Sequence, residues 1–300
     1  MSHHHTPLVL LLLASLFVGC ASHKPVVRDP HVVLIGIDGW NATCMDSADI
    51  PHIRALMDAG CWTLHKRSVI PTSSAMNWCS MFMGVGIEFH GYTTWGSATP
   101  ELPSVTTNAH GIAPSFFSLL REHQPDAEIG CLYEWNTIKC FIDTLSVNYY
   151  EQADMEQPTQ LCDKAVDYIT TAHPTLAAVI FDQVDHVGHA DGHDTPQYMA
   201  RLHDVDGYVG RIVQAVTDAG LADRTIFIVT SDHGGINKGH GGVTPNEAEA
   251  PFVLAGPGIL PTGEIQEPMA QYDVASTVLH LFGIPQPTSW RGRVPSVLTK

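Results

Sequence analysis

The chain has 300 residues, of which 44% are hydrophobic, and its 15 basic and 31 acidic side chains give a net charge of −16. A chain of this length buries roughly 75% of the surface that its unfolded form exposes, which is enough for one large globular domain. The acidic balance excludes a protein that grips nucleic-acid backbones nonspecifically, because that function needs a basic face. Phosphate esters remain compatible with it where bound metal ions supply positive charge locally. The 18 histidines favour such a metal site.

Residues 1–20 predict a signal peptide rather than part of the fold. The run PLVLLLLASLFVGC is apolar, too short to span a bilayer, and ends at a small residue before Cys20. Its ending resembles a bacterial lipobox, in which the cysteine is lipidated; the alternative is a cleaved soluble product. We therefore expect export to the periplasm or anchoring as an outer-membrane lipoprotein, with membrane contact only through that lipid. Residues 21–30 are the predicted linker and residues 31–300 the predicted catalytic domain.

Export also affects how the cysteines are interpreted. Of the seven cysteines, all except Cys20 lie outside the signal peptide and form an even set. An oxidising compartment permits such a set to pair as disulfides. Cys131 and Cys140 are the pair expected from proximity in the sequence. The cysteine spacings do not match a zinc knuckle, so no cysteine is assigned to metal.

Strand-like and helix-like segments alternate along the predicted domain. Runs of β-branched residues predict buried strands, and apolar residues recurring every three or four positions predict helices. In chain order we expect a strand at 31–40, helices at 50–60, 75–84 and 114–127, a strand at 128–135, a helix at 158–174, a strand at 176–185, a helix at 195–220, strands at 224–235 and 251–259, and a helix at 272–283. This alternation predicts a single α/β domain with a mostly parallel sheet and helices on both faces.

Acidic and histidine side chains follow three of the predicted strands. They are Asp38 after VVLIGI, Asp185 and His189 after AAVIFDQV, and Asp232 and His233 after TIFIVTS. Ligand sites of open α/β sheets lie just outside the carboxyl ends of the strands, so these groups should meet at one edge. His240 follows His233 by seven residues on the glycine-rich stretch NKGHGG, which can fold back toward that edge.

Each of these groups taken alone has an ordinary structural interpretation. A strand-end Asp before glycine, such as Asp38, is more often a turn or a helix cap. Asp185 and His189 are four residues apart and could form a plain helix-surface pair. Together, however, three Asp and three His suit two divalent metal ions with open positions for a substrate.

The stretch VIPTSSAMNW, residues 69–78, places a cluster of hydroxyls ahead of a predicted helix. Serine and threonine are favoured helix caps, which is the ordinary interpretation. The functional one uses the same geometry, because a helix N-terminus stabilises both an alkoxide and a phosphate. Beside a metal ion, a serine hydroxyl could ionise near neutral pH and act as a nucleophile. Asn77 lies on the same helical face as Ser74 and is a candidate donor to a phosphoryl oxygen.

These motifs, in this order, resemble the alkaline phosphatase superfamily, in particular its type I phosphodiesterase/nucleotide pyrophosphatase branch. The similar stretches cover nearly all of the mature chain and are IGIDG, IPHIRALMDAG, PTSSAMNW, VDHVGH, TSDHGG, KGHGGVTPNEAEAPFVLAGPGI and YDVASTVLHLFGIPQP. The resemblance implies Ser74 as the nucleophile and Asn77 as the amide on the oxyanion side. It implies one metal held by Asp185, His189 and His240. It implies a second held by Asp38, Asp232, His233 and Ser74. Zinc is the metal implied in both sites, and the residue types also allow manganese.

The implied reaction is a two-step hydrolysis of a small phosphate ester through a phosphoserine, with no nucleic-acid polymer as partner. Nucleotide-cleaving members carry an aromatic residue after the nucleophile, where this chain has Ala75; Trp78, Tyr133 and Trp135 are candidate replacements. Sulfatases need x-Pro-x-Arg after the reactive residue, and the stretch SAMN lacks it. A phosphomonoesterase or phosphonate hydrolase stays open as an alternative, as does a non-catalytic metal-binding lipoprotein. The leaving group and the number of subunits are left open.

Overall fold

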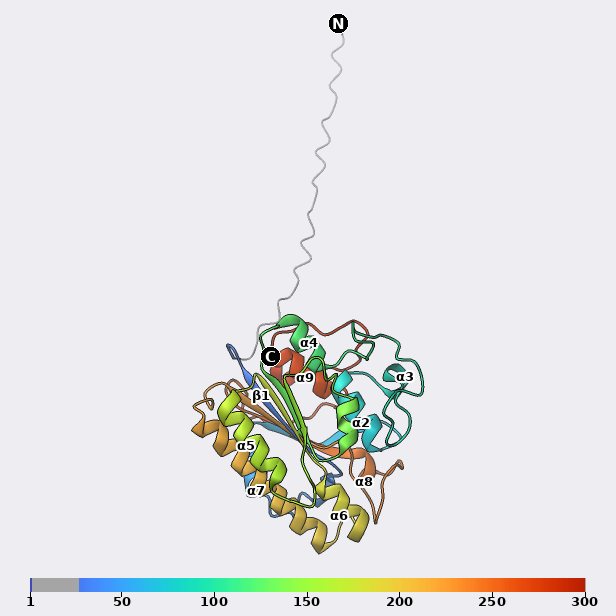
Figure 1. Ribbon diagram of the computed structural model, residues 1–300, viewed down its shortest axis with the longest axis vertical. Coiled ribbons are helices and arrows are strands. Elements are labelled where there is room, and N and C mark those ends of the chain that lie inside the picture. Colours follow the sequence, from blue (N-terminus) through green and yellow to red (C-terminus); the bar gives the residue numbers. More distant parts are fainter. Residues whose placement is uncertain (2–26, 300) are drawn as a thin grey trace.

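The computed structural model describes Met1 and residues 27–299, so the predicted signal peptide and Cys20 lie outside the described residues. One eight-stranded sheet runs through the centre of the described part, in the order β4-β3-β5-β1-β6-β7-β2-β8 (Figure 1). The strands are β1 (His31–Ile37), β2 (Cys61–Arg67), β3 (Ile129–Tyr133), β4 (Tyr149–Gln152), β5 (Leu176–Phe181), β6 (Thr225–Thr230), β7 (Glu249–Ala255) and β8 (Gly263–Glu264).

The sheet is mostly parallel, as the alternation of segments predicts. Strands β4, β3, β5, β1 and β6 run parallel to one another, and β7 runs antiparallel to both β6 and β2. Every residue of β5 and β6 is buried, and so is nearly all of β1. Continuous apolar strands of this kind are typical of a parallel sheet covered on both faces.

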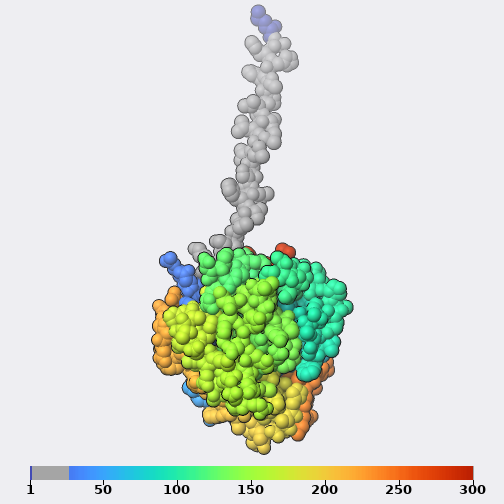
Figure 2. Space-filling model, viewed as in Figure 1, coloured from blue at the N-terminus to red at the C-terminus, as the bar shows by residue number. Residues whose placement is uncertain are grey.

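Helices cover both faces of the sheet (Figure 1). They are α1 (Pro51–Ala59), α2 (Ser74–Met83), α3 (Ile87–His90), α4 (Phe116–His123), α5 (Gln160–Ala172), α6 (Gln183–Asp191), α7 (Pro196–Asp218), α8 (Pro245–Ala248) and α9 (Asp273–Leu281), with short 3-10 helices η1 (Ala42–Cys44), η2 (Asn136–Cys140) and η3 (Ser296–Leu298). Helices α2, α4 and α9 pack into one apolar core with one face of the sheet, and α1, α5 and α7 into a second core with the other face. The segment around and after α3 forms a flank of the molecular surface, coloured turquoise in Figure 2. Among the described residues, no helix has both the length and the apolar character needed to cross a membrane.

Several elements were not expected, among them β4, α3, α8 and β8, and two further differences bear on the sheet. Strand β2 was not expected, because its sequence CWTLHKR mixes apolar and charged residues. It is tolerated in the sheet because the fully buried Lys66 donates to the carbonyl oxygen of Ser231 and to the side chain of Gln271. The strand expected at 176–185 ends at Phe181, and α6 begins two residues later.

The expected Cys131–Cys140 disulfide is wrong for this structure. All six cysteines in the described part of the chain are free thiols. Cys131 is buried in the middle of β3, whereas Cys140 ends η2. The chain continues along β3 beyond Cys131 before it turns into η2, so proximity in the sequence does not bring the two thiols together.

Candidate active site

Three neighbouring strands end at one edge of the sheet and carry the predicted acidic residues there. Strands β5, β1 and β6 are adjacent, and Asp38 and Asp232 follow β1 and β6 within two residues. The backbone N–H of Asp38 donates to the Phe181 carbonyl of β5 at 2.8 Å, and the backbone N–H of Gly39 donates to Asp232 Oδ1 at 3.2 Å. The structure therefore brings together the side chains that the strand ends predict.

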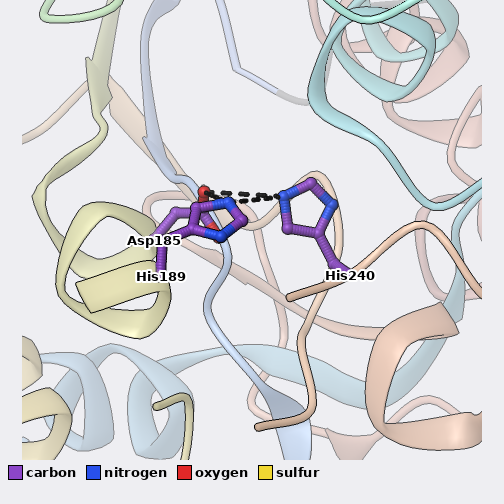
Figure 3. A group of neighbouring side chains, drawn as sticks. All are labelled: Asp185, His189 and His240. Carbon is purple, nitrogen blue, oxygen red and sulfur yellow. Dashed lines mark hydrogen bonds and ion pairs between the residues drawn. The ribbon is translucent and has the colours of Figure 1, made fainter. Parts of the chain in front are cut away.

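Asp185, His189 and His240 form the first group of side chains (Figure 3). Asp185 and His189 lie one turn apart on the same face of α6, and His240 approaches from the loop on the opposite side. Asp185 Oδ2 lies 3.1 Å from His189 Nε2 and 3.6 Å from His240 Nε2. Their ligand atoms fall within 4.8 Å of one another, which is compatible with a shared metal ion.

A second group, formed by Asp38, Asp232 and His233, is almost entirely buried. His233 Nε2 lies 3.2 Å from Asp232 Oδ2 and 3.5 Å from Asp38 Oδ1. Among the described residues, neither of these two carboxylate oxygens has a hydrogen-bond partner. The ligand atoms of Asp38 and His233 also lie within 4.8 Å of Asp185, so Asp185 stands between the two groups.

The three histidines present the same ring nitrogen to the carboxylates. His189 Nδ1 lies 3.1 Å from the Lys238 carbonyl, His233 Nδ1 lies 2.8 Å from the Gly234 carbonyl, and His240 Nδ1 lies 2.8 Å from the Thr72 carbonyl. A carbonyl oxygen only accepts, so each Nδ1 carries a proton, and each Nε2 is the ring nitrogen that would give its lone pair to a bound metal ion. Metal-ligating histidines are oriented in this way by backbone carbonyls.

Burial and mutual repulsion of the carboxylates dominate the electrostatics of the site. Burial raises the pKa of Asp38 well above its usual range, and the charges of Asp232 and Asp185 raise it further. Burial raises the pKa of Asp232 to about 7 and lowers the pKa of His233 to about 3. Burial alone would also raise the pKa of Asp185, but hydrogen bonds from three histidines hold it well below its usual range. A divalent cation would offset this concentrated negative charge, so the donor set fits two metal ions.

Ser74 is the first residue of α2, and its hydroxyl faces the second group. Ser74 Oγ lies 3.1 Å from His233 Nε2, and the residue is 5% exposed. The neighbouring Ser73 makes no capping bond with its side chain, and the Thr72 hydroxyl donates to the Gly242 carbonyl instead. None of the three hydroxyls therefore caps α2 through its side chain, which favours the functional interpretation of Ser74.

Asn77 is engaged with the segment that precedes the helix. Its Oδ1 accepts the Val69 N–H at 2.8 Å, and its Nδ2 donates to the carbonyls of Ser73 at 3.0 Å and Val69 at 3.2 Å. The side chain is fully buried. These contacts give Asn77 a visible role in shaping the segment that presents Ser74, which differs from the expected role as a donor to substrate.

The three aromatic residues considered as replacements for the family's aromatic residue after the nucleophile differ in how exposed their side chains are. Trp78 and Tyr133 are buried, and Trp78 donates its indole N–H to Asp38 Oδ2 at 2.8 Å. Trp135 is half-buried and stacks on Trp95, with ring centroids 6.1 Å apart and planes at 21°. Trp95 is 65% exposed and had no place among the predicted residues. No motif marks Trp95, because it lies in irregular chain between α3 and α4.

His193 is a second residue of the site region that the sequence pattern did not single out. Its Nε2 lies 3.0 Å from Asp185 Oδ1, and its side chain is fully buried. The only signal was the abundance of histidine in VDHVGHADGHD, because a separation of eight residues does not match one helix face.

The fold is that of the alkaline phosphatase-like α/β proteins, and solved structures of that class align with most of the chain. Murine ectonucleotide pyrophosphatase/phosphodiesterase 5, solved as an inactive variant in complex with AMP, aligns with a TM-score of 0.69 at 15% identity, over 87% of this chain and 97% of that chain. A 2-O GAG sulfatase aligns with a TM-score of 0.72 at 14% identity, over 91% of this chain and 75% of that chain.

The profile of the type I phosphodiesterase / nucleotide pyrophosphatase family matches residues 32–240, and the chain belongs to this family. Bis(5'-adenosyl)-triphosphatase enpp4 of Mus musculus is 25% identical over 240 residues, which are 76% of this chain and 52% of that protein. Its Homo sapiens counterpart is 23% identical over 239 residues, again 76% and 52% of the two chains. The chain spans about half the length of these relatives.

Proposed function

We propose that this protein is a two-metal phosphoric ester hydrolase, in particular a phosphodiesterase of the nucleotide pyrophosphatase type, acting through a phosphoserine at Ser74. One metal would be held by Asp185, His189 and His240. The other would be held by Asp38, Asp232, His233 and Ser74. Zinc in both sites is the proposed occupant, with manganese as the second choice.

The orientation of the three histidines carries this proposal. Each ring is tied through Nδ1 to a backbone carbonyl and presents Nε2 toward buried carboxylates. Two of those carboxylate oxygens, on Asp38 and Asp232, have no partner among the described residues, although an unpaired buried anion is costly. Cations bound at this sheet edge would satisfy both the lone pairs and the anions.

The proposed reaction begins at the Ser74 hydroxyl, which stands at the N-terminus of a ten-residue helix. Ser74 Oγ attacks phosphorus, the Oγ–P bond forms, the bond from phosphorus to the leaving oxygen breaks, and the leaving alkoxide takes up a proton. A water then attacks phosphorus, which releases a phosphomonoester and restores the serine hydroxyl. The metal ions, when bound, lower the pKa of the hydroxyl and of water and offset charge on the phosphoryl oxygens. The free N–H groups and positive end of α2 favour the same anionic groups.

The proposed substrate is a small ester with a flat aromatic group, such as a nucleotide. The names of the relatives, a bis(5'-adenosyl)-triphosphatase and a phosphodiesterase in complex with AMP, support a nucleotide ester. The position after the nucleophile, Ala75, is fully buried and offers no stacking surface. Trp135 and the exposed Trp95 are the aromatic pair proposed to take that role.

Sulfate ester hydrolysis is disfavoured although sulfatases appear among the structural neighbours. A likeness at 14% identity concerns the fold alone. Arylsulfatase K of Danio rerio is 31% identical only over 94 residues, which are 30% of this chain. Ser74 is followed by Ala-Met-Asn, without the x-Pro-x-Arg pattern of sulfatases.

A comparison of bis-p-nitrophenyl phosphate with p-nitrophenyl phosphate, on zinc-loaded wild type and Ser74→Ala, tests this function. We expect faster turnover of the diester and loss of turnover in the variant. A preference for the monoester would move the protein to the phosphomonoesterase alternative, with the same nucleophile. Activity that survives in Ser74→Ala would refute the nucleophile, and failure of the loaded wild type on both esters would favour the non-catalytic binding protein.

A further inference from the structure

His193 is the most completely enclosed titratable side chain beside the predicted metal ligands. Its ring Nε2 lies 3.0 Å from Asp185 Oδ1, and its ring Nδ1 lies 3.0 Å from the Asn237 carbonyl. Its backbone N–H donates to the same Asn237 carbonyl at 2.7 Å. The side chain is 0% exposed, and the rings of His189, Tyr198 and His240 also lie against it.

The chain has to reverse direction to place His193 there. A separation of eight residues along one helix corresponds to about 12 Å, too far for contact with Asp185. Helix α6 ends at Asp191, and Gly192 follows with φ 120°, a conformation that L side chains rarely adopt. The turn carries the His193 ring back beneath the first turn of α6.

Two glycines form the slot that receives the ring. A Cβ added to Gly188 would lie 2.5 Å from His193 Nε2, and one added to Gly235 would lie 2.2 Å from its Cδ2. Neither position tolerates a larger residue while the ring stays in place. Gly188 belongs to α6, and Gly235 belongs to the loop between His233 and His240, so the ring is clamped between the two elements that carry ligands.

The two oxygens of Asp185 have separate partners. Oδ2 faces His189 at 3.1 Å and His240 at 3.6 Å, whereas Oδ1 is bound by His193. A carboxylate oxygen only accepts, so His193 Nε2 is the donor in this bond. Like the three predicted ligand histidines, His193 has its Nδ1 tied to a backbone carbonyl, but its Nε2 binds the oxygen of Asp185 other than the one that faces His189 and His240.

We propose that His193 is a positioning residue for the metal site. It anchors Asp185 Oδ1, so that Asp185 Oδ2 is presented to the ion shared with His189 and His240. The proposal rests on the proposed two-metal function. Partners of ligating carboxylates typically change metal affinity or activity by 10–100-fold when they are removed.

The same residue holds the loop that bears His240. The Asn237 carbonyl accepts two N–H groups of His193, and the next carbonyl, that of Lys238, is bound by His189 Nδ1. His240 follows two residues further along this loop. Loss of the His193 contacts would therefore loosen Asp185 and His240 together, while His189 stays on its helix.

The test compares two side chains of nearly equal length at this position. His193→Gln keeps an N–H donor near the place of Nε2, and His193→Met fills the slot without a donor. His186→Gln is the matched control, because His186 is an exposed histidine on the same helix α6. The readouts are zinc affinity by chelator competition on the full chain, and the visible spectrum of the cobalt(II)-substituted protein.

We expect His193→Met to bind the weaker-held of two zinc ions about 10–100-fold less tightly, with a changed cobalt spectrum. His193→Gln should stay within about threefold of wild type and keep the wild-type spectrum, like His186→Gln. Equal losses of zinc affinity in His193→Met and His193→Gln would show that only packing matters and would overturn the inference. So would unchanged zinc affinity and an unchanged spectrum in His193→Met. A wild type that binds no zinc would overturn the proposed function itself, whereas zinc binding without ester hydrolysis would leave this inference standing.

Discussion

The indole N–H of Trp78 donates to Asp38 Oδ2 at 2.8 Å, and the other oxygen of Asp38 is left facing the metal-ligand cluster. Trp78 lies one turn beyond Ser74 on α2. The bond therefore ties the helix that begins at Ser74 to the strand end that carries Asp38. Both side chains are buried, so water does not replace this contact.

Replacement of Trp78 with Phe should lower the free energy of unfolding by about 1–3 kcal/mol, because a buried acceptor on a charged group loses its donor. It should also weaken zinc binding. Trp40→Phe is the matched control, since Trp40 is equally buried and its Nε1 has no partner within the described residues. Urea unfolding and chelator competition give the two quantities. Equal losses of stability and zinc affinity in Trp78→Phe and Trp40→Phe would show that the effect comes from packing and not from the Trp78–Asp38 hydrogen bond.

Asn77→Ala should lower both stability and activity. The amide makes four hydrogen bonds to the backbone of residues 69–73, and their loss should cost about 2–4 kcal/mol. The turnover number should fall with it, because the segment that presents Ser74 loosens. Urea unfolding of the metal-free protein separates the two possible roles. An unchanged free energy of unfolding with a reduced turnover number would instead support Asn77 as a direct donor to substrate.

Removal of metal should abolish hydrolysis and lower the melting temperature. Without cations, Asp38, Asp185 and Asp232 repel one another in a buried site, and two of their oxygens lack partners among the described residues. Zinc should restore activity and raise the melting temperature in a concentration-dependent way, because it binds the folded state. Dialysis against a chelator, followed by an assay of ester hydrolysis and by differential scanning calorimetry, measures both changes. A chelated protein with full activity and an unchanged melting temperature would contradict the two-metal site.

Acid should destabilise the protein partly through His90, the last residue of α3, whose ring contacts Ser80 of α2. Burial lowers the pKa of His90 to about 4, since the ring is held neutral between the Ser80 hydroxyl and the Tyr92 N–H. Between pH 6.5 and about 4 the unfolded chain binds the proton first, so stability falls as pH falls through this window. The contribution is at most about 3 kcal/mol. The free energy of unfolding should change less between pH 7 and pH 4.5 in His90→Gln than in wild type. An equal change in the two proteins would exclude His90 as a source of the acid destabilisation.

Trp95→Ala should raise the KM for bis-p-nitrophenyl phosphate about 3- to 10-fold and leave kcat unchanged. An increase of this size is what the loss of one stacking contact between aromatic rings would cause. Trp95→Phe should keep most of the affinity. Leu145→Ala provides a control, because Leu145 is another exposed apolar side chain, 73% exposed, and is not part of the aromatic pair. If both alanine variants raise KM equally, the Trp95–Trp135 pair is not a substrate platform.

Much of the site could be inferred from residue order alone. Asp38, Asp185 and Asp232 follow apolar strands, and the carboxyl ends of parallel strands meet at one edge whatever the loops do. The hydroxyl cluster at residues 72–74, ahead of an apolar helix, stood out for a similar reason, because a helix N-terminus is where an anion is stabilised, and the family resemblance then singled out Ser74. These inferences needed only the period of the apolar residues and the direction of the chain.

The tertiary structure alone decided which atoms face the site. The Nδ1 contacts of His189 and His240 join residues 49 and 168 positions apart in the chain, so no local pattern predicts them. Cys131 stayed unpaired because β3 carries it into the buried core, whereas Cys140 ends η2. His193 reaches Asp185 only through a chain reversal at a glycine. Strand and helix periods determine where a residue lies along the sheet edge, but long-range hydrogen bonds determine which of its atoms meets the substrate.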